Sequence, residues 1–329
     1  MAAGEEAAPP FVEASVAVQL PAELGEGSIW DQRSKRLLWL DIMHAKIYRF
    51  DPETNTNEEH HLNAHSAHVS SVVPLSIQDD PTGNKVGLTL REGFAIYDFK
   101  TESMTLLPDN PPVAERERFN DGKVDPAGRY WAGTIARDAS GAPVAEATLY
   151  RRNIDGSISK MLETVTISNG IIWSEDASTM YYIDTPSAQI DAFDYDVSSG
   201  EVKNRRPCVT GFDFNTTGFP DGCTIDSEGM LWVARFNGGC AGRYDPATGK
   251  LLAEVRVPAT AGRQVTSVAF GGEGLGDLYL TTAHEGKTAE EAAAAGLPLA
   301  GCLFRATRAE LQKLGAAPGQ PVHMLRCSL

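Results

Sequence analysis

A motif that recurs about every 47 residues is the feature that most constrains the fold of this chain. Each copy has a polar residue, a glycine, a short apolar stretch, a turn rich in Asp, Ser and Gly, and a second stretch with an aromatic residue. Four copies are clear: GEGSIWDQRSKRLLWLD, NDGKVDPAGRYWAG, NGIIWSEDASTMYYID and DGCTIDSEGMLWVA. Two weaker copies are VSSVVPLSIQDDPTGNKVGLT and VTSVAFGGEGLGDLYLTT. The anchors of the second stretch, about 44 to 51 residues apart as in β-propeller blades, are Trp39, Gly87, Trp131, Tyr182, Trp232 and Tyr279.

The residues between the anchors indicate strands and hairpins. KIYRFDPETN, GFAIYDFKTES and CAGRYDPATGK alternate apolar and polar residues and end in turn residues, which is typical of hairpins. Only TAEEAAAAG has helical spacing, and we expect a surface helix or loop there. We therefore predict an all-β fold, a six-bladed β-propeller with a central metal site, as a single domain over residues 1–329. VEASVAVQL would supply a strand that closes the ring, and residues 1–12 would form a flexible tail.

Composition limits the kinds of binding partner and the cellular compartment that we expect for this chain. The net charge of −15 and the pI near 4.9 argue against binding to nucleic acid or an anionic membrane. No apolar run is long enough to span a membrane, and the N-terminus lacks the regions of a signal peptide. The five scattered cysteines predict reduced thiols in a cytoplasmic protein, without a zinc site built on sulfur. In HHLNAHSAH we expect a solvated linker, with a metal cluster as the alternative.

The slot before the glycine of each repeat is the candidate site. Equivalent positions on the innermost strands of a propeller converge on its channel, so side chains from distant segments would meet there. Each polar residue with its glycine could also be an ordinary turn, and FNDG at residues 119–122 has that composition. The slot holds Glu26, Asp121, Asn169 and Asp221, with Ser70 and Thr266 near it in the weaker copies.

Electrostatics favour a cation in that slot. Two carboxylates about 4 Å apart repel each other by about 4 kcal/mol at an effective dielectric constant near 20. Several carboxylates with an amide oxygen make an oxygen-only site, which suits Ca²⁺, Mg²⁺ or Mn²⁺ and also admits Zn²⁺ or Fe²⁺. We therefore predict one divalent ion, with further coordination positions left for water and substrate.

Several long motifs resemble the senescence marker protein/gluconolactonase family, also called regucalcin-like. They are RFNDGKVDPAGRYWAGTI, SNGIIWSEDASTMYYIDT, AFDYDVSSGEVKNRR and PDGCTIDSEGMLWVARFNGG, and the resemblance runs from about Leu24 to Phe304. It implies a six-bladed propeller with one divalent cation in its channel, and enzymes of the family open sugar lactones. The implied metal ligands are Glu26, Asn169 and Asp221.

The resemblance also implies a substrate-binding pair, Arg118 and Asn120. The repeat alignment selects Asp121 instead of its neighbour Asn120; we follow the resemblance and expect Asp121 to cap or brace the turn. A further substrate contact, often Glu in the family, matches Asp138, whose shorter side chain puts the preferred sugar in doubt.

The resemblance and the slot together predict a metal-dependent lactonase. It would hydrolyse an aldonolactone such as gluconolactone to the free acid, with metal-bound water as the nucleophile and Asp221 as general base. The expected partner is a small-molecule sugar lactone, and no obligate protein partner is evident. Two alternatives stay open, a non-catalytic calcium-binding regulatory protein and a propeller hydrolase for a different lactone or ester.

Overall fold

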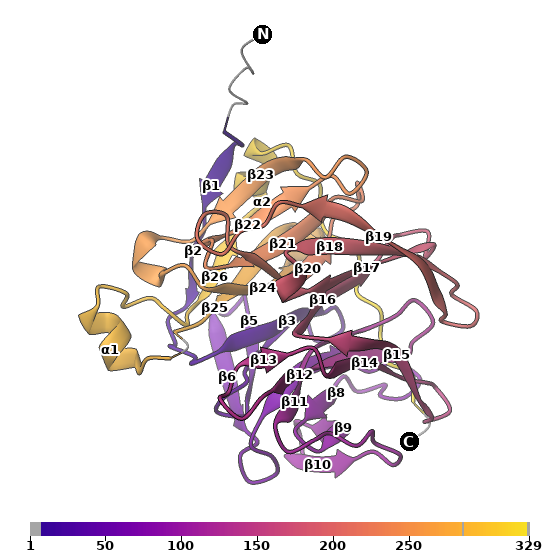
Figure 1. Cartoon of the computed structure of the whole chain (residues 1–329). Coiled ribbons are helices and arrows are strands. Elements are labelled where there is room, and N and C mark those ends of the chain that lie inside the picture. The colour runs from indigo at the N-terminus through magenta and orange to yellow at the C-terminus, as the bar shows by residue number, and fades with distance from the viewer. Residues whose placement is uncertain (1–7, 285, 328–329) are drawn as a thin grey trace.

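The strands of this protein form a ring of six sheets. The structure, a computed structural model, describes residues 8–284 and 286–327, and the strands within them form six sheets of four or five strands (Figure 1). The innermost strands contact one another in cyclic order, β3 with β7, β11, β16, β20, β24 and again β3. This confirms the predicted all-β, six-bladed propeller.

Each of the first five blades begins with its innermost strand and runs outward as an antiparallel meander. Blade 1 is β3 (Gly25–Asp31), β4 (Arg36–Asp41), β5 (Lys46–Asp51) and β6 (Thr56–His61). Blade 2 is β7 (Val69–Pro74), β8 (Lys85–Leu90), β9 (Gly93–Asp98) and β10 (Ser103–Leu106). Blade 3 is β11 (Glu117–Val124), β12 (Tyr130–Arg137), β14 (Ala147–Arg152) and β15 (Ile158–Val165), with β13 (Pro143–Val144) beside β12.

The remaining blades follow the same plan. Blade 4 is β16 (Ser168–Trp173), β17 (Thr179–Asp184), β18 (Gln189–Tyr195) and β19 (Val202–Thr210). Blade 5 is β20 (Phe219–Ile225), β21 (Leu231–Phe236), β22 (Cys240–Tyr244) and β23 (Leu251–Arg256). Blade 6 has β24 (Val265–Gly271), β25 (Asp277–Thr282) and β26 (Leu303–Ala306), and its fourth strand comes from the other end of the chain.

The N-terminal segment closes the ring. Strand β2 (Ser15–Val18) pairs antiparallel with β26, which confirms that VEASVAVQL supplies the closing strand. Strand β1 (Phe11–Glu13) pairs in parallel with β23 and widens blade 5 (Figure 1). The flexible tail expected over residues 1–12 included Phe11 and Val12, which instead belong to this strand. Residues 1–7 lie outside the described residues.

Helices occur only as short connections in the described part of the chain. Helix α1 (Ala289–Ala294) lies in the segment TAEEAAAAG, and Thr288 and Glu291 form a capping box at its N-terminus. Helix α2 (Arg308–Lys313) was not predicted, although Thr307 and Glu310 form the same capping signal. Short 3₁₀ turns are η1 (Thr185–Ser187), η2 (Ala259–Ala261) and η3 (Glu273–Leu275). None of the described helices is long and apolar enough to cross a membrane.

The predicted anchors lie on the second strand of each blade, and five of the six are fully buried aromatic residues. Two of them are tied to the preceding turn by an aspartate. The indole nitrogens of Trp131 and Trp232 donate to Asp125 (2.8 Å) and Asp226 (3.2 Å), while each aspartate also accepts two backbone N–H groups of its own turn. In both copies of the D-x₅-W spacing, one aspartate thus holds the turn of the hairpin and also fixes the buried tryptophan on the next strand.

The C-terminal segment crosses the end of the channel opposite the start of the innermost strands. Its Gln320 N–H donates to the Ile225 carbonyl in blade 5 (3.2 Å), and its Leu325 N–H donates to the Pro74 carbonyl in blade 2 (2.9 Å). Leu325 is 2% exposed. A Cβ built on Gly87 would lie 2.5 Å from the Leu325 side chain. By strand register Gly87 is equivalent to the aromatic anchors of blades 3, 5 and 6, so the C-terminal segment fills the gap that glycine leaves.

Replacing Leu325 with alanine should destabilise the ring. The change removes a buried side chain from a close-packed site, and we expect a loss of about 2–5 kcal/mol in the free energy of unfolding. Denaturant titration followed by circular dichroism would measure it. The control is Arg326→Ala, since Arg326 is exposed on the same segment and should change stability by about 0.5 kcal/mol or less. Equal small effects of both changes would contradict a sealing role for Leu325.

A pH test probes the same segment. Burial lowers the pKa of His323 below its usual range, with Asp125 opposing this shift and Lys123 adding to it. The unfolded chain therefore binds this proton more readily, and stability is lost as the pH falls below the ordinary histidine pKa of about 6.5. Between about pH 7.5 and 5, we expect the wild type to lose more stability than His323→Gln. The exposed His65→Gln controls for removal of an imidazole; wild-type behaviour in His323→Gln would refute the assignment.

Candidate active site

A β-bulge recurs at one place in every blade. Between the first and second strands the pairing skips one residue of the innermost strand, as in the step from Ser168↔Asp184 to Ile171↔Tyr182. Bulges redirect side chains from the ladder. The equivalent pairs directly before the skip are Val69↔Leu90, Phe119↔Thr134, Pro220↔Arg235 and Val265↔Thr282. In blade 1 the equivalent pair is Gly25↔Asp41, and Glu26↔Leu40 still pairs before the skip.

The residue directly after each of these six equivalent pairs occupies what we call the bulge slot. These six residues are Glu26, Ser70, Asn120, Asn169, Asp221 and Thr266, each 7% exposed or less. The ring therefore brings Glu26, Asn169 and Asp221, the three predicted metal ligands, to equivalent positions around the channel. Blades 2 and 6 contribute only hydroxyl groups.

Strand pairing selects Asn120 and not Asp121 for the slot of blade 3. Asp121 stands one residue later, where blades 4 and 5 have Gly170 and Gly222. Its carboxylate accepts the Gly122 N–H (2.7 Å) and borders a small internal cavity together with Lys123. Burial raises the pKa of Asp121, and the charge of Lys123 opposes the shift. The repeat alignment selected Asp121 because it placed Gly122 opposite Gly170 and Gly222. In blade 3 the residue equivalent to those two glycines is Asp121, so the slot residue lies one position earlier, at Asn120.

Hydrogen bonds link the slots of blades 3, 4 and 5. The amide nitrogen of Asn120 donates to Asn169 Oδ1 (2.9 Å), and the amide nitrogen of Asn169 donates to the Thr185 hydroxyl (2.7 Å). Thr185 in turn donates to the Pro220 carbonyl (2.9 Å), beside Asp221. These bonds fix the orientation of the Asn169 amide. An amide oxygen has two lone pairs, so Asn169 Oδ1 keeps capacity for a further partner.

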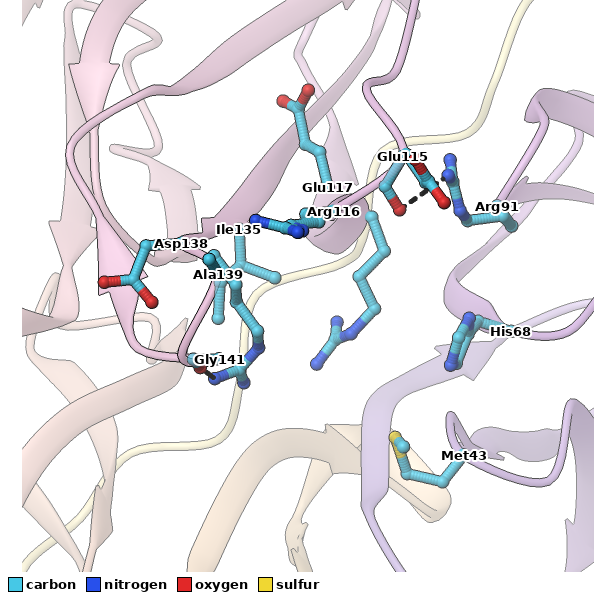
Figure 2. Close-up of a pocket in the computed structure, with 12 residues that line it drawn as sticks. Met43, His68, Arg91, Glu115, Arg116, Glu117, Ile135, Asp138, Ala139 and Gly141 are labelled. Atoms are coloured by element: carbon cyan, nitrogen blue, oxygen red, sulfur yellow. Dashed lines mark hydrogen bonds between the residues drawn. The ribbon is translucent and has the colours of Figure 1, made fainter.

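Arg118 connects this network to a pocket at the mouth of the channel. Its guanidinium donates to Asn120 Oδ1 (2.7 Å) and to the Phe119 carbonyl (2.9 Å). The same side chain lines a pocket of about 440 Å³, to which blade 1 contributes Met43 and blade 2 contributes His68 and Arg91 (Figure 2). The structure thus brings Arg118 and Asn120 together, as expected for a pair that orients one ligand.

Asp138 borders the pocket but its carboxylate is used elsewhere. Its Oδ1 accepts the Ser140 hydroxyl (2.6 Å) and the backbone N–H groups of Ser140 (2.8 Å) and Ala142 (3.0 Å). The Ser140 hydroxyl and these amides hold the pKa of Asp138 below its usual range. Figure 2 shows the carboxylate at the edge of the group, directed away from His68 and Met43. A substrate contact by Asp138 stays a prediction and requires this turn to open.

Sequence reasoning missed several residues around the site. Thr185 braces Asn169 from the turn after β17. It is the last residue of the motif SNGIIWSEDASTMYYIDT, but the motif gave it no role. The segment HHLNAHSAH is only partly a linker, since His60 and His61 end strand β6 and His68 lines the pocket. The five cysteines are free and four of them are buried, consistent with the expected reduced thiols.

The bulge slots provide a donor set that fits a divalent cation. Two buried carboxylates, Glu26 and Asp221, share the channel with the amide oxygen of Asn169, and hard cations prefer oxygen ligands of this kind. Within the described ranges there is no group of three or more His, Cys, Asp or Glu side chains placed to hold a metal. The predicted set is not of that type, because one of its three members is an amide.

Comparisons with known proteins agree with the fold. The family described as SMP-30/gluconolactonase/LRE-like region matches residues 24–284. A Bacillus subtilis protein, named as a candidate sugar lactone lactonase YvrE, is 39% identical over 270 residues, covering 82% of this chain and 87% of its own. Regucalcin of Danio rerio is 40% identical over 290 residues, covering 87% and 90% of the two chains.

A solved structure shares the whole architecture. The calcium-binding protein regucalcin of Agrobacterium tumefaciens has a TM-score of 0.79 and 25% identity, covering 96% of this chain and 98% of its own. The fold is thus that of a propeller of the regucalcin type. The chain belongs to the SMP-30/gluconolactonase/LRE-like family.

Proposed function

We propose that this protein is a metal-dependent hydrolase that opens a sugar lactone, an aldonolactone such as gluconolactone, to the free acid. The observation that carries the proposal is the hydrogen-bonded series Arg118–Asn120–Asn169, which runs from the pocket to the slot of blade 4 and continues through Thr185 to the Pro220 carbonyl beside Asp221. The family and the name of the Bacillus subtilis relative support lactone hydrolysis.

Glu26, Asn169 and Asp221 would hold one divalent ion, which the name of the Agrobacterium relative makes plausible for Ca²⁺. When bound, such an ion polarises a carbonyl oxygen and lowers the pKa of water. The remaining chemistry belongs to the side chains. Arg118 and Asn120 would orient the hydroxyl and carbonyl oxygens of the lactone, so that the carbonyl carbon faces the attacking water.

Asp221 is the proposed general base. Its carboxylate would accept a proton as the water oxygen bonds to the carbonyl carbon. When the bond between that carbon and the ring oxygen breaks, the departing ring oxygen takes up a proton and becomes the hydroxyl of the open acid. A buried carboxylate suits this role, because exclusion of bulk water strengthens its interaction with the transferred proton.

Replacing Asp221 with alanine should abolish turnover while the fold persists. We expect kcat/KM for gluconolactone to fall by about 100-fold to 10,000-fold, the range for loss of a general base, and further if the metal is also lost. A pH-indicator assay of lactone hydrolysis measures this, with circular dichroism to verify folding. The matched control is Ser70→Ala, which changes the same slot in blade 2 and should keep most of the activity. Retained activity in Asp221→Ala would refute the assignment.

Replacing Thr185 with valine should weaken metal binding. The change removes the hydroxyl that holds the Asn169 amide, and loss of such a supporting hydrogen bond costs about 10-fold to 100-fold in metal affinity. Calorimetric titration with Ca²⁺ and Mn²⁺ gives the dissociation constants without any need for activity. Thr185→Ser keeps the hydroxyl and should bind like the wild type. If Thr185→Val also binds like the wild type, Asn169 is not a ligand.

The calcium titration, together with a screen of lactone hydrolysis, separates the two alternatives from the lactonase. A calcium-binding regulatory protein would bind Ca²⁺ tightly and hydrolyse none of the five- and six-membered sugar lactones in a screen. A hydrolase for another ester would lose that other activity in Asp221→Ala. Hydrolysis that is abolished by chelator and restored by several divalent ions would support the lactonase.

A further inference from the structure

The pocket above the bulge slots is rich in arginine. Blades 2 and 3 contribute four guanidinium groups to its wall, although the chain as a whole carries a net charge of −15. A neutral sugar ring needs hydrogen-bond donors and acceptors but no concentration of positive charge. The arginines that line the pocket are Arg91, Arg116, Arg118 and Arg137.

Three carboxylates, those of Glu115, Glu117 and Asp138, also line the pocket, so its wall holds one guanidinium group more than it holds carboxylates. Glu117 accepts the Thr134 hydroxyl (2.5 Å) and the Ala114 N–H (3.1 Å), and Figure 2 shows its carboxylate directed away from Met43 and His68. Asp138 is engaged in its own turn. Among the described residues, Arg91, Arg116 and Arg137 have no carboxylate partner within salt-bridge distance.

Neutral carbonyl groups hold two of these guanidinium groups in place. Arg91 donates to the carbonyls of Ala114 and Glu115, both at 3.0 Å, and Arg137 donates to the carbonyl of Gly141 (2.8 Å). Such contacts position the charge without cancelling it. The effect reaches His68, whose pKa is lowered first by burial and then by the charges of Arg118 and Arg91.

We infer that the pocket binds a sugar lactone that carries an anionic group, a carboxylate or a phosphate, at the end remote from the reacting carbonyl. Arg116 and Arg137 bind this group, while Arg118 and Asn120 hold the lactone end. Arginine matches the geometry of both anions, since its planar fork donates two parallel hydrogen bonds. The inference rests on the proposed lactonase function and narrows its substrate class.

The arginines could instead serve the carboxylate that hydrolysis itself creates. That carboxylate forms at the carbonyl carbon, on the side of Asn120 and the bulge slots. Arg116 is exposed, and Arg137 is held by the carbonyl of the exposed Gly141, whereas Asn120 is buried. A charge at the other end of the substrate therefore suits these two arginines better. An experiment can separate the two cases. Every lactone yields the carboxylate at the carbonyl carbon, whereas only some lactones carry a second, remote charge.

The test compares three lactones at low ionic strength: neutral gluconolactone, its 6-phosphate, and a lactone of the dicarboxylic acid glucarate. We expect kcat/KM for at least one charged lactone to exceed that for the neutral one by about 10-fold to 100-fold. The charged lactone that is preferred identifies phosphate or carboxylate as the bound group. Added salt should reduce the ratio.

Arg116→Gln and Arg137→Gln should each reduce the ratio of charged to neutral kcat/KM by about 10-fold. The matched control is Arg206→Gln, which removes the same charge from the outermost strand of blade 4 and should keep both the ratio and the activity. Equal kcat/KM values for charged and neutral lactones, unchanged in Arg116→Gln, would overturn the inference and leave the lactonase proposal intact.

A binding experiment covers the case in which no lactone is hydrolysed. Calorimetric titration with gluconate 6-phosphate and with glucarate measures recognition of the two anions by the folded protein. Binding that weakens about 10-fold in Arg116→Gln but not in Arg206→Gln would support an anion pocket, even though the lactonase proposal had failed. Absence of binding, or equal binding by both variants, would overturn the inference.

Discussion

One extra residue in the innermost strand of each blade determines which side chains reach the channel. The bulge interrupts the ladder after equivalent pairs in five blades and one pair later in blade 1, so six distant segments present one residue each at the same level. The sequence then differentiates the blades, with carboxylates or amides in blades 1, 3, 4 and 5 and hydroxyls in blades 2 and 6. The backbone positions of the site are therefore equivalent in all six blades, and only the side chains at them differ.

Much of the fold could be predicted because its signals are local and repeated. Aromatic anchors such as Trp131 and Trp232 lie at blade spacing, and a strand at Ser15–Val18 was needed to complete blade 6. The slots of Glu26, Asn169 and Asp221 followed from the same repeat. The choice between Asn120 and Asp121 did not, because sequence alignment cannot locate a bulge in a strand where a side chain replaces the usual glycine.

Other features depend on the assembled ring and leave no local signal. Thr185 supports Asn169 only because the turn after β17 lies against the start of β20. The arginines of the pocket come from segments between residues 91 and 137, and their convergence depends on how blades 2 and 3 meet. The net charge of the whole chain is negative, and it does not show where arginines gather. It therefore could not predict the arginine-rich pocket.

The two ends of the chain complete the ring at different places. Strand β2 finishes the last blade, while Leu325 fills the gap beside Gly87 in the second blade. During translation, blade 2 therefore leaves the ribosome long before Leu325, which it needs for its packing. Blade 6 has all four of its strands as soon as β26 has emerged, because β2 was made first. A nascent chain from which Leu325 has not yet emerged holds nearly all of the described strands yet keeps an opening in its hydrophobic interior, so apolar surface stays exposed until Leu325 packs there.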